Sequence, residues 1–193
     1  KLIKYYSLIN HNLIYENEAI NRYKINSNLA IKGSRGKELQ KLKKTIGAVK
    51  NCLLKKNSAN IVFSDGNPNS KIMIIGEGPG ANEDLEGVPF IGKTGELLDK
   101  MLISINLDRD SVYITNVVNY RPPENRSPTK EEIARYLPFL IRHIEIIEPK
   151  ILILLGSSAL NAVLGGGQKI SEVRGKWLIK KIGKCNTSVI VSF

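Results

Sequence analysis

From residue 71 onward, short apolar runs alternate with longer segments of helical periodicity, and this alternation limits the fold more than any other feature. Apolar runs of strand length lie at 72–75, 112–114, 151–155 and 189–192, and helical patterns lie between them at 95–105, 130–147 and 157–164. Strands that alternate with helices form right-handed crossovers and a mainly parallel sheet. We therefore expect an α/β fold of three αβα layers, with a central, mostly parallel four-stranded sheet. The loops at the carboxyl ends of its strands should build the site.

The N-terminal quarter has a different pattern. We expect residues 1–45 to form a basic, partly helical extension and residues 46–193 to form one α/β domain. From Glu38 to Leu54, apolar residues recur at helical spacing over a Lys-rich face, which predicts an amphipathic, basic helix. No run approaches the roughly 18 apolar residues of a membrane span, and no signal peptide is recognisable. A cytoplasmic monomer without a membrane partner is expected.

The formal charge of +11 favours a polyanionic partner, because basic surfaces concentrate phosphates. The excess is uneven: residues 1–50 carry 11 Lys or Arg and 3 acids, whereas residues 51–193 carry 18 and 15. A solvated basic helix explains this charge as well as nucleic-acid binding does. The two cysteines, Cys52 and Cys185, lie far apart and outside any C-x-x-C pair, so we interpret both as free thiols.

The first loop with chemical content follows the strand at 72–75. It contains G-E-G-P-G at 76–80, E-D at 83–84 and G-V-P-F-I-G at 87–92. Its glycines allow sharp turns and bring backbone N–H groups close to a ligand, and its two acids are expected where a substrate would lie. A dinucleotide-binding fingerprint is the rival interpretation. That motif needs a helix to open within it, and Pro79 and the acids interrupt such a helix.

The second loop follows the strand at 112–114. It begins with Thr115-Asn116 and continues as R-P-P-E-N-R-S-P at 121–128. An Asn at the end of a strand is often only a turn former. Arginines in a proline-stiffened loop, however, present fixed forks that suit phosphates.

Taken together, these motifs resemble the uracil-DNA glycosylase superfamily. The resemblance is to its family-4 type, the phage DNA polymerase-related group. The resemblance extends upstream through V-F-x-D-G-N-P at 62–68. Downstream it includes L-P-F-L at 137–140 and V-R-G-K-W at 173–177, so that it covers roughly residues 50–193. It implies hydrolysis of the N-glycosidic bond of uracil in DNA during base-excision repair. The base must first leave the stack, which costs least in mismatches or single strands.

The resemblance also implies roles for particular residues. Uracil would stack on Phe90, and the carboxamide of Asn116 would donate to O4 and accept from N3–H. The backbone of Glu77 and Gly78 would approach the O2 side of the base. Glu83 is the candidate for positioning or activating the attacking water, although a helix N-cap or a salt-bridge partner is an open alternative for it.

Four further candidates come from the same resemblance. Asn125 is a second catalytic candidate, for the water or for the departing pyrimidine. The residues expected to hold flanking phosphates are Lys93, Arg121 and Arg126. Fixed dipoles and charges stabilise an oxocarbenium sugar and a uracil anion well, so a pocket with few strong side chains can catalyse.

The family binds a four-iron, four-sulfur cluster through four cysteines, and this chain departs from that pattern. The motifs place Val49, Cys52, Tyr120 and Tyr136 at the four positions. One thiolate cannot hold a cluster that takes four. We therefore expect no cluster and no other metal or cofactor, with aromatic and apolar packing in its space.

The sequence given ends at Phe193, before the H-P-S or H-P-A segment that the resemblance implies next. We interpret this end as a truncation and expect the chain as given to be weak or inactive without that His. Neither His11 nor His143 lies where it would substitute. Two other functions stay open: an impaired relative that binds single-stranded or damaged DNA, and a nucleotide-binding domain of another function.

Overall fold

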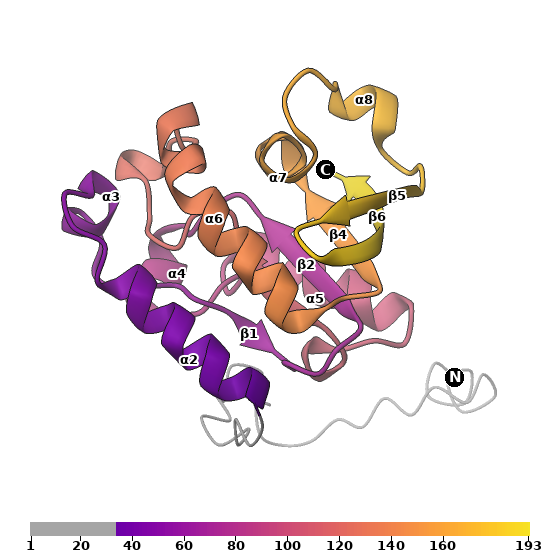
Figure 1. Ribbon diagram of the computed structural model, residues 1–193, viewed down its shortest axis with the longest axis horizontal. Coiled ribbons are helices and arrows are strands. Elements are labelled where there is room, and N and C mark those ends of the chain that lie inside the picture. The colour runs from indigo at the N-terminus through magenta and orange to yellow at the C-terminus, as the bar shows by residue number, and fades with distance from the viewer. Residues whose placement is uncertain (1–33) are drawn as a thin grey trace, which may run out of the picture.

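The computed structural model describes residues 34–193, which form one six-stranded sheet covered by helices (Figure 1). The strand order is β1-β3-β2-β4-β6-β5. The bounds are β1 (Asp65–Gly66), β2 (Ile72–Gly76), β3 (Tyr113–Asn116), β4 (Ile151–Leu155), β5 (Leu178–Ile182) and β6 (Cys185–Ser192). The four inner strands, β3, β2, β4 and β6, are parallel, which confirms the predicted parallel sheet. The antiparallel edge strands β1 and β5 were not predicted.

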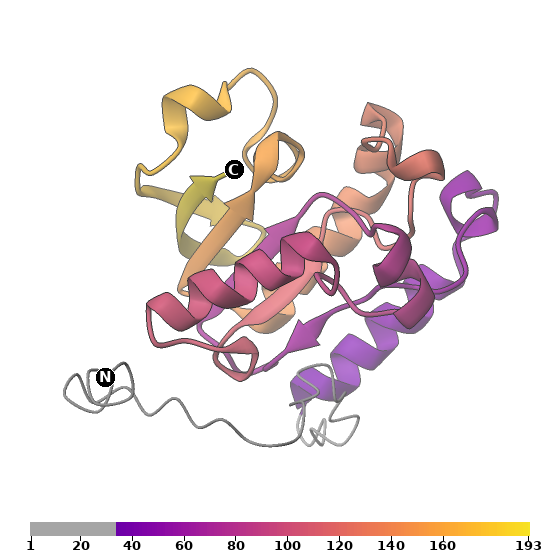
Figure 2. The same ribbon diagram turned by 180° about the vertical axis from the view of Figure 1, so that it is seen from behind.

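Helices cover both faces of the sheet. In Figure 1, α2 and α6 lie in front of it, and Figure 2 shows α5 on the opposite face. The longer helices are α2 (Ser34–Gly47), α5 (Lys93–Ser104), α6 (Lys130–Ile147) and α7 (Gly156–Leu164), and the short ones are α3 (Leu53–Lys56), α4 (Ala81–Glu86), α8 (Ile170–Val173), η1 (Arg109–Ser111) and η2 (Pro123–Asn125). No helix in the described part of the chain has the length and apolarity that a bilayer crossing needs.

The sheet has a separate core on each of its faces. Met73 and Ile75 of β2 point into the larger core, which also contains residues of α2, α6 and α7. Ile74, between them, points to the other face and packs with Leu98 and Leu102 of α5. Successive residues of a strand face opposite sides, so burial on both sides explains why β2 is continuously apolar.

The single helix predicted for 38–54 is wrong in extent. α2 begins earlier and ends at Gly47, and α3 is a separate helix from Leu53. Gly47 has a low helix propensity, and Asn51 adopts a left-handed φ of 52°, which breaks the helical path between them. α2 packs on α6 as part of the larger core, so the expected boundary at residue 45 falls inside α2. The expectations for residues 1–33 lie outside the described residues.

The register of the parallel strands places two site candidates side by side. Gly76, the last residue of β2, is the direct partner of Asn116, the last residue of β3. The ladder continues past both strands, because the Val117 N–H donates to the Gly76 carbonyl at 2.9 Å. The two loops identified in the sequence therefore start from neighbouring points on one edge of the sheet.

A neutral histidine is buried in the larger core. The His143 ring stacks on Phe63 with 4.6 Å between centroids, and its Nε2 atom lies 2.6 Å from the Tyr113 hydroxyl. Burial lowers the pKa of His143 to about 3. In the unfolded chain this histidine has an ordinary pKa near ~6.5, so below that pH it binds a proton that the buried ring in the folded chain does not bind. The free energy of unfolding is therefore not reduced by His143 above the pKa of the unfolded chain, and it falls as the pH drops from there toward 3.

This proton linkage predicts a measurable pH dependence of stability. Between pH ~6.5 and ~4, we expect His143 to lower the free energy of unfolding by up to about 1.4 kcal/mol per pH unit. Urea unfolding of the chain and of His143→Gln across this range isolates the effect, because carboxylates contribute similarly to both proteins. The Gln variant should show the shallower slope. Equal slopes would contradict a neutral, buried His143.

Candidate active site

Phe90 and Asn116 converge on the same small volume above Gly76. A Cβ atom built on Gly76 would lie 2.4 Å from Phe90 Cζ and 2.6 Å from Asn116 Oδ1. Only a residue without a side chain leaves room for both groups at this point. An aromatic ring and a carboxamide thus meet at the carboxyl edge of the sheet, as the resemblance implied.

Asn116 is a buried amide at the end of β3. It is 3% exposed, and within the described residues no hydrogen bond engages its carboxamide. The carboxamide is not among the fully buried side-chain atoms of residues 34–193 that lack a hydrogen bond, so part of it is accessible to a small ligand or water. The turn-forming alternative therefore explains this Asn less well. The half-buried ring of Phe90 packs at the margin of the α5 core, with part of its surface open.

Glu83 locks the backbone of the glycine-rich loop. Its Oε1 atom accepts from the N–H groups of Ile91 at 3.1 Å and Gly92 at 2.8 Å, and Oε2 accepts from Gly80 N–H at 3.1 Å. The residue is 8% exposed and also completes the capping box of α4. This geometry favours the helix-cap alternative over the expected activation of water, because both carboxylate oxygens already hold the loop.

The neighbouring acid has a similar structural task. Asp84 accepts backbone N–H bonds from Ala59 at 3.0 Å and Asn60 at 3.2 Å. The Asn60 side chain donates in return to the Asp84 carbonyl at 2.9 Å. Both acids thus bind backbone: Glu83 fixes the loop at 80–92, and Asp84 fixes the segment before β1.

Glu77 and Gly78 lie directly beyond β2. The Glu77 carbonyl accepts from Val118 N–H at 3.2 Å, and a Cβ on Gly78 would lie 2.8 Å from Val118 Cγ2, so the two loops are in close contact. The Glu77 carboxylate accepts a short hydrogen bond from Ser158 in the first turn of α7. Ser158 was not predicted from the sequence. It follows β4 closely, and the carboxyl end of that parallel strand lies at the same edge of the sheet as Gly76 and Asn116. Arg109, which contacts the Phe90 loop, was not predicted either.

The loop at 121–128, called the arginine loop, is held partly by hydrogen bonds of its own side chains. Arg121 donates from Nε to Asn125 Oδ1 at 2.7 Å, and Asn125 is exposed with a left-handed φ of 55°. Among residues 34–193 no hydrogen bond joins Asn125 to Glu83, the other catalytic candidate. Arg126 makes a bidentate pair with Glu132 at 2.7 Å for both bonds, which occupies its fork. Lys93 is exposed at the first position of α5.

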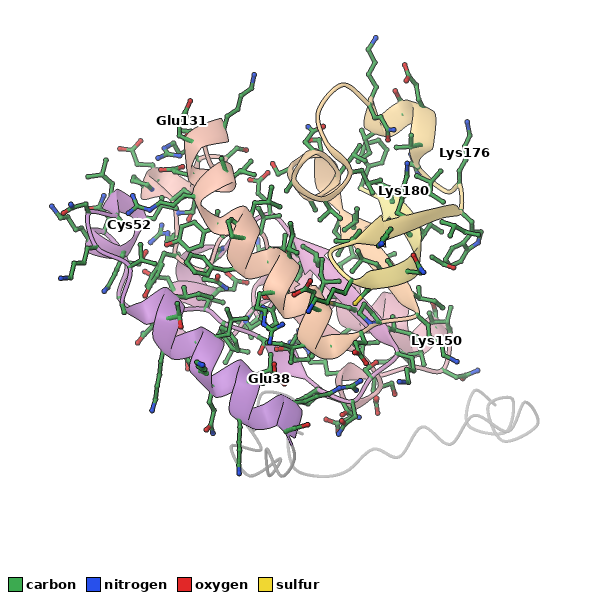
Figure 3. All side chains as sticks on the ribbon, viewed as in Figure 1. Glu38, Cys52, Glu131, Lys150, Lys176 and Lys180 are labelled. Carbon is green, nitrogen blue, oxygen red and sulfur yellow. The ribbon has the colours of Figure 1, made fainter. Side chains whose placement is uncertain are left out.

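At the four positions where the resemblance implies cluster-binding cysteines, the side chains present do not supply four thiolates. Cys52 Sγ lies 3.3 Å from the Tyr136 hydroxyl, and the rings of Tyr136 and Tyr120 meet edge to face at 6.4 Å. Val49 packs against the same core. Figure 3 places Cys52 beside α3, away from the β5 edge at Lys180. No group of three or more metal-ligating residues is found among residues 34–193.

This packing predicts a protein without stoichiometric iron. A [4Fe–4S] cluster takes four thiolates, whereas one cysteine and two tyrosines lie here. We expect anaerobically purified protein to lack absorption near ~400 nm and to contain well under one iron per chain. Four irons per chain with that absorption band would contradict the prediction.

Comparison with known proteins gives a family match. Residues 63–193 match the family model described as the uracil DNA glycosylase superfamily. The matched segment includes β2, β3 and both loops of the site.

Several relatives carry names that agree with this match. A type-4 uracil-DNA glycosylase of Sulfurisphaera tokodaii is 43% identical over 148 residues, covering 74% of this chain and 67% of the relative. One from Thermotoga maritima is 44% identical over 131 residues, covering 66% and 68%. A DNA polymerase of Bacillus phage SP01 is 35% identical over 124 residues, covering 64% of this chain and 13% of the polymerase.

Proposed function

The chain belongs to the uracil DNA glycosylase superfamily, and from this premise we propose that it hydrolyses the N-glycosidic bond of uracil in DNA. The observation that carries the proposal is the meeting of the Phe90 ring and the Asn116 carboxamide above Gly76. A ring and a buried amide at one point suit a flat base with alternating donors and acceptors.

The same geometry suggests how the base is read. Uracil extruded from the strand stacks on Phe90, and Asn116 donates to O4 and accepts from N3–H. Cytosine presents the opposite pattern at these two atoms, so it would leave the amide unpaired in a buried place. The backbone at Glu77 and Gly78 faces the O2 side, where negative charge develops as the base departs.

Catalysis in this proposal depends mainly on preorganised polar groups. Glu83 keeps the loop of Gly80, Ile91 and Gly92 in one conformation, so that the loop needs no reorganisation during the reaction. Asn125, beside Arg121, is proposed to contact the water or the departing base once DNA is bound. The chain uses no metal or cofactor in this scheme.

An oligonucleotide assay tests the function. A labelled single strand with one deoxyuridine is incubated with the chain and then treated with alkali, beside strands that carry deoxycytidine or thymidine at that position. We expect scission only at deoxyuridine. A chain that neither cleaves nor binds the strand, but whose melting temperature rises with free nucleotides, would overturn the proposal.

One observation favours a second candidate, a relative that binds single-stranded or damaged DNA without excision. Both oxygens of Glu83 are engaged by the backbone, so the described residues offer no obvious acid to activate water at that position. Salt-dependent binding of the deoxyuridine strand without scission would establish this candidate.

The arginine loop gives a prediction about DNA affinity. We propose Lys93, Arg121 and Arg126 as phosphate contacts, but Glu132 already holds the Arg126 fork. Arg121→Ala should therefore reduce the slope of log affinity against log salt by about 1 for a uracil-free strand, and Arg126→Ala by less. Fluorescence anisotropy across salt concentrations measures both slopes. A full unit lost in Arg126→Ala, with no change in Arg121→Ala, would reverse this assignment.

A further inference from the structure

Arg109 binds the backbone of the loop that carries Phe90. It lies in η1, just before β3, and its side chain is 16% exposed. Nη1 donates to the Pro89 carbonyl at 3.2 Å, and Nη2 donates to the Phe90 carbonyl. Its guanidinium thus binds two successive carbonyls of the loop that carries the ring.

Two acids from different elements fix the guanidinium in turn. Asp99 of α5 accepts from Nε at 2.8 Å, and Asp65 of β1 accepts from Nη1 at 2.7 Å. Their side chains are 15% and 33% exposed, so the pairs are largely shielded from solvent. A guanidinium is a planar, rigid set of donors, and four bonds to three elements leave it little freedom.

The Phe90 backbone needs such support. Its φ is 56°, in the left-handed region that a bulky residue rarely adopts. Gly95 of α5 lies against the same peptide, where a Cβ would come within 1.7 Å of the Phe90 carbonyl oxygen. The carbonyl therefore lies in a narrow space between α5 and the donors of Arg109, and its position determines where the ring points.

We infer that Arg109, held by Asp65 and Asp99, is a positioning residue that sets the Phe90 ring for the extruded base. The inference rests on the proposed function, because it assigns the ring to uracil. Arg109 acts through Phe90 and makes no contact with DNA itself.

A double-mutant cycle tests this coupling. Arg109→Lys keeps the charge but cannot supply the planar fork to two carbonyls and two acids. In single-turnover assays we expect it to reduce the excision rate constant on the order of 100-fold, which is the cost of a misplaced group. In a Phe90→Leu background the same substitution should change the rate less than about threefold, because the ring that Arg109 positions is gone. Equal losses in both backgrounds would overturn the inference.

Controls separate positioning from general damage. Arg142→Lys alters an exposed arginine paired with Glu38 and Glu145, and excision should be unchanged. Affinity for a uracil-free strand should also be unchanged in Arg109→Lys. If Arg109→Lys melts below the assay temperature, Gly95→Ala replaces it in the cycle, because the added methyl group would displace the same Phe90 carbonyl.

The outcomes also separate this inference from the proposed function. A wild-type chain that excises no uracil refutes both. A wild-type chain that is active, impaired by Phe90→Leu and unimpaired by Arg109→Lys refutes only the role of Arg109.

Discussion

Replacing Asn116 with Ala should lower the rate constant of uracil excision on the order of 10³-fold, the cost of removing a preorganised polar group from a site. Asn116 is 3% exposed, and within residues 34–193 its carboxamide has no hydrogen-bond partner. Its loss therefore removes contacts to the base rather than contacts within the fold. Single-turnover excision from a deoxyuridine strand measures the effect, and the melting temperature should change little.

Asn119 provides a matched control three residues along the chain. It is 4% exposed, but its Nδ2 atom donates to the Val62 carbonyl at 3.1 Å. Asn119→Ala should therefore lower the melting temperature while the excision rate is largely retained. If both variants lose stability and rate in parallel, Asn116 is a structural residue and does not read the base.

Replacing Gly76 with Ala should block the site while the sheet stays intact. The added methyl group would lie 2.4 Å from Phe90 Cζ and 2.6 Å from Asn116 Oδ1, so one of the two groups must move. A displacement of about 1 Å at a reacting site can cost on the order of 100-fold in rate. Excision should fall by at least this factor, and affinity for a uracil-free strand should stay close to that of the wild-type chain.

Gly166→Ala is the control for the added methyl group. Nothing lies within 4 Å of a Cβ at Gly166, so this variant should keep the wild-type rate. Full activity in Gly76→Ala would mean that the ring and the carboxamide do not bound the substrate space at this point.

The central sheet could be predicted because burial on both faces makes its parallel strands continuously apolar. The edge strands could not be predicted. β1 is only two residues long, and β5 alternates buried or half-buried residues with the exposed Ile179 and Lys181. Such strands depend on pairing with β3 and β6 rather than on local apolarity.

The site could be predicted where its residues follow strands, as Asn116 does, because parallel strands end at one edge. The loop at 87–92 carries Phe90 back to that edge, and the motif resemblance was needed to identify it. The partners of Glu83 and Arg109 could not be predicted from the sequence. Glu83 binds N–H groups 8 and 9 residues away, and Arg109 binds carbonyls 19 and 20 residues away. These contacts depend on how two loops fold against α5, which no local pattern encodes.

Phe90 and Asn116 are proposed to bound one slot for a flat pyrimidine. A crystal structure of the chain with free uracil tests this arrangement. We expect the base to stack on the Phe90 ring, with its O4 and N3 atoms hydrogen-bonded to the Asn116 carboxamide. Uracil bound elsewhere on the chain, with Phe90 and Asn116 still in contact above Gly76, would contradict it.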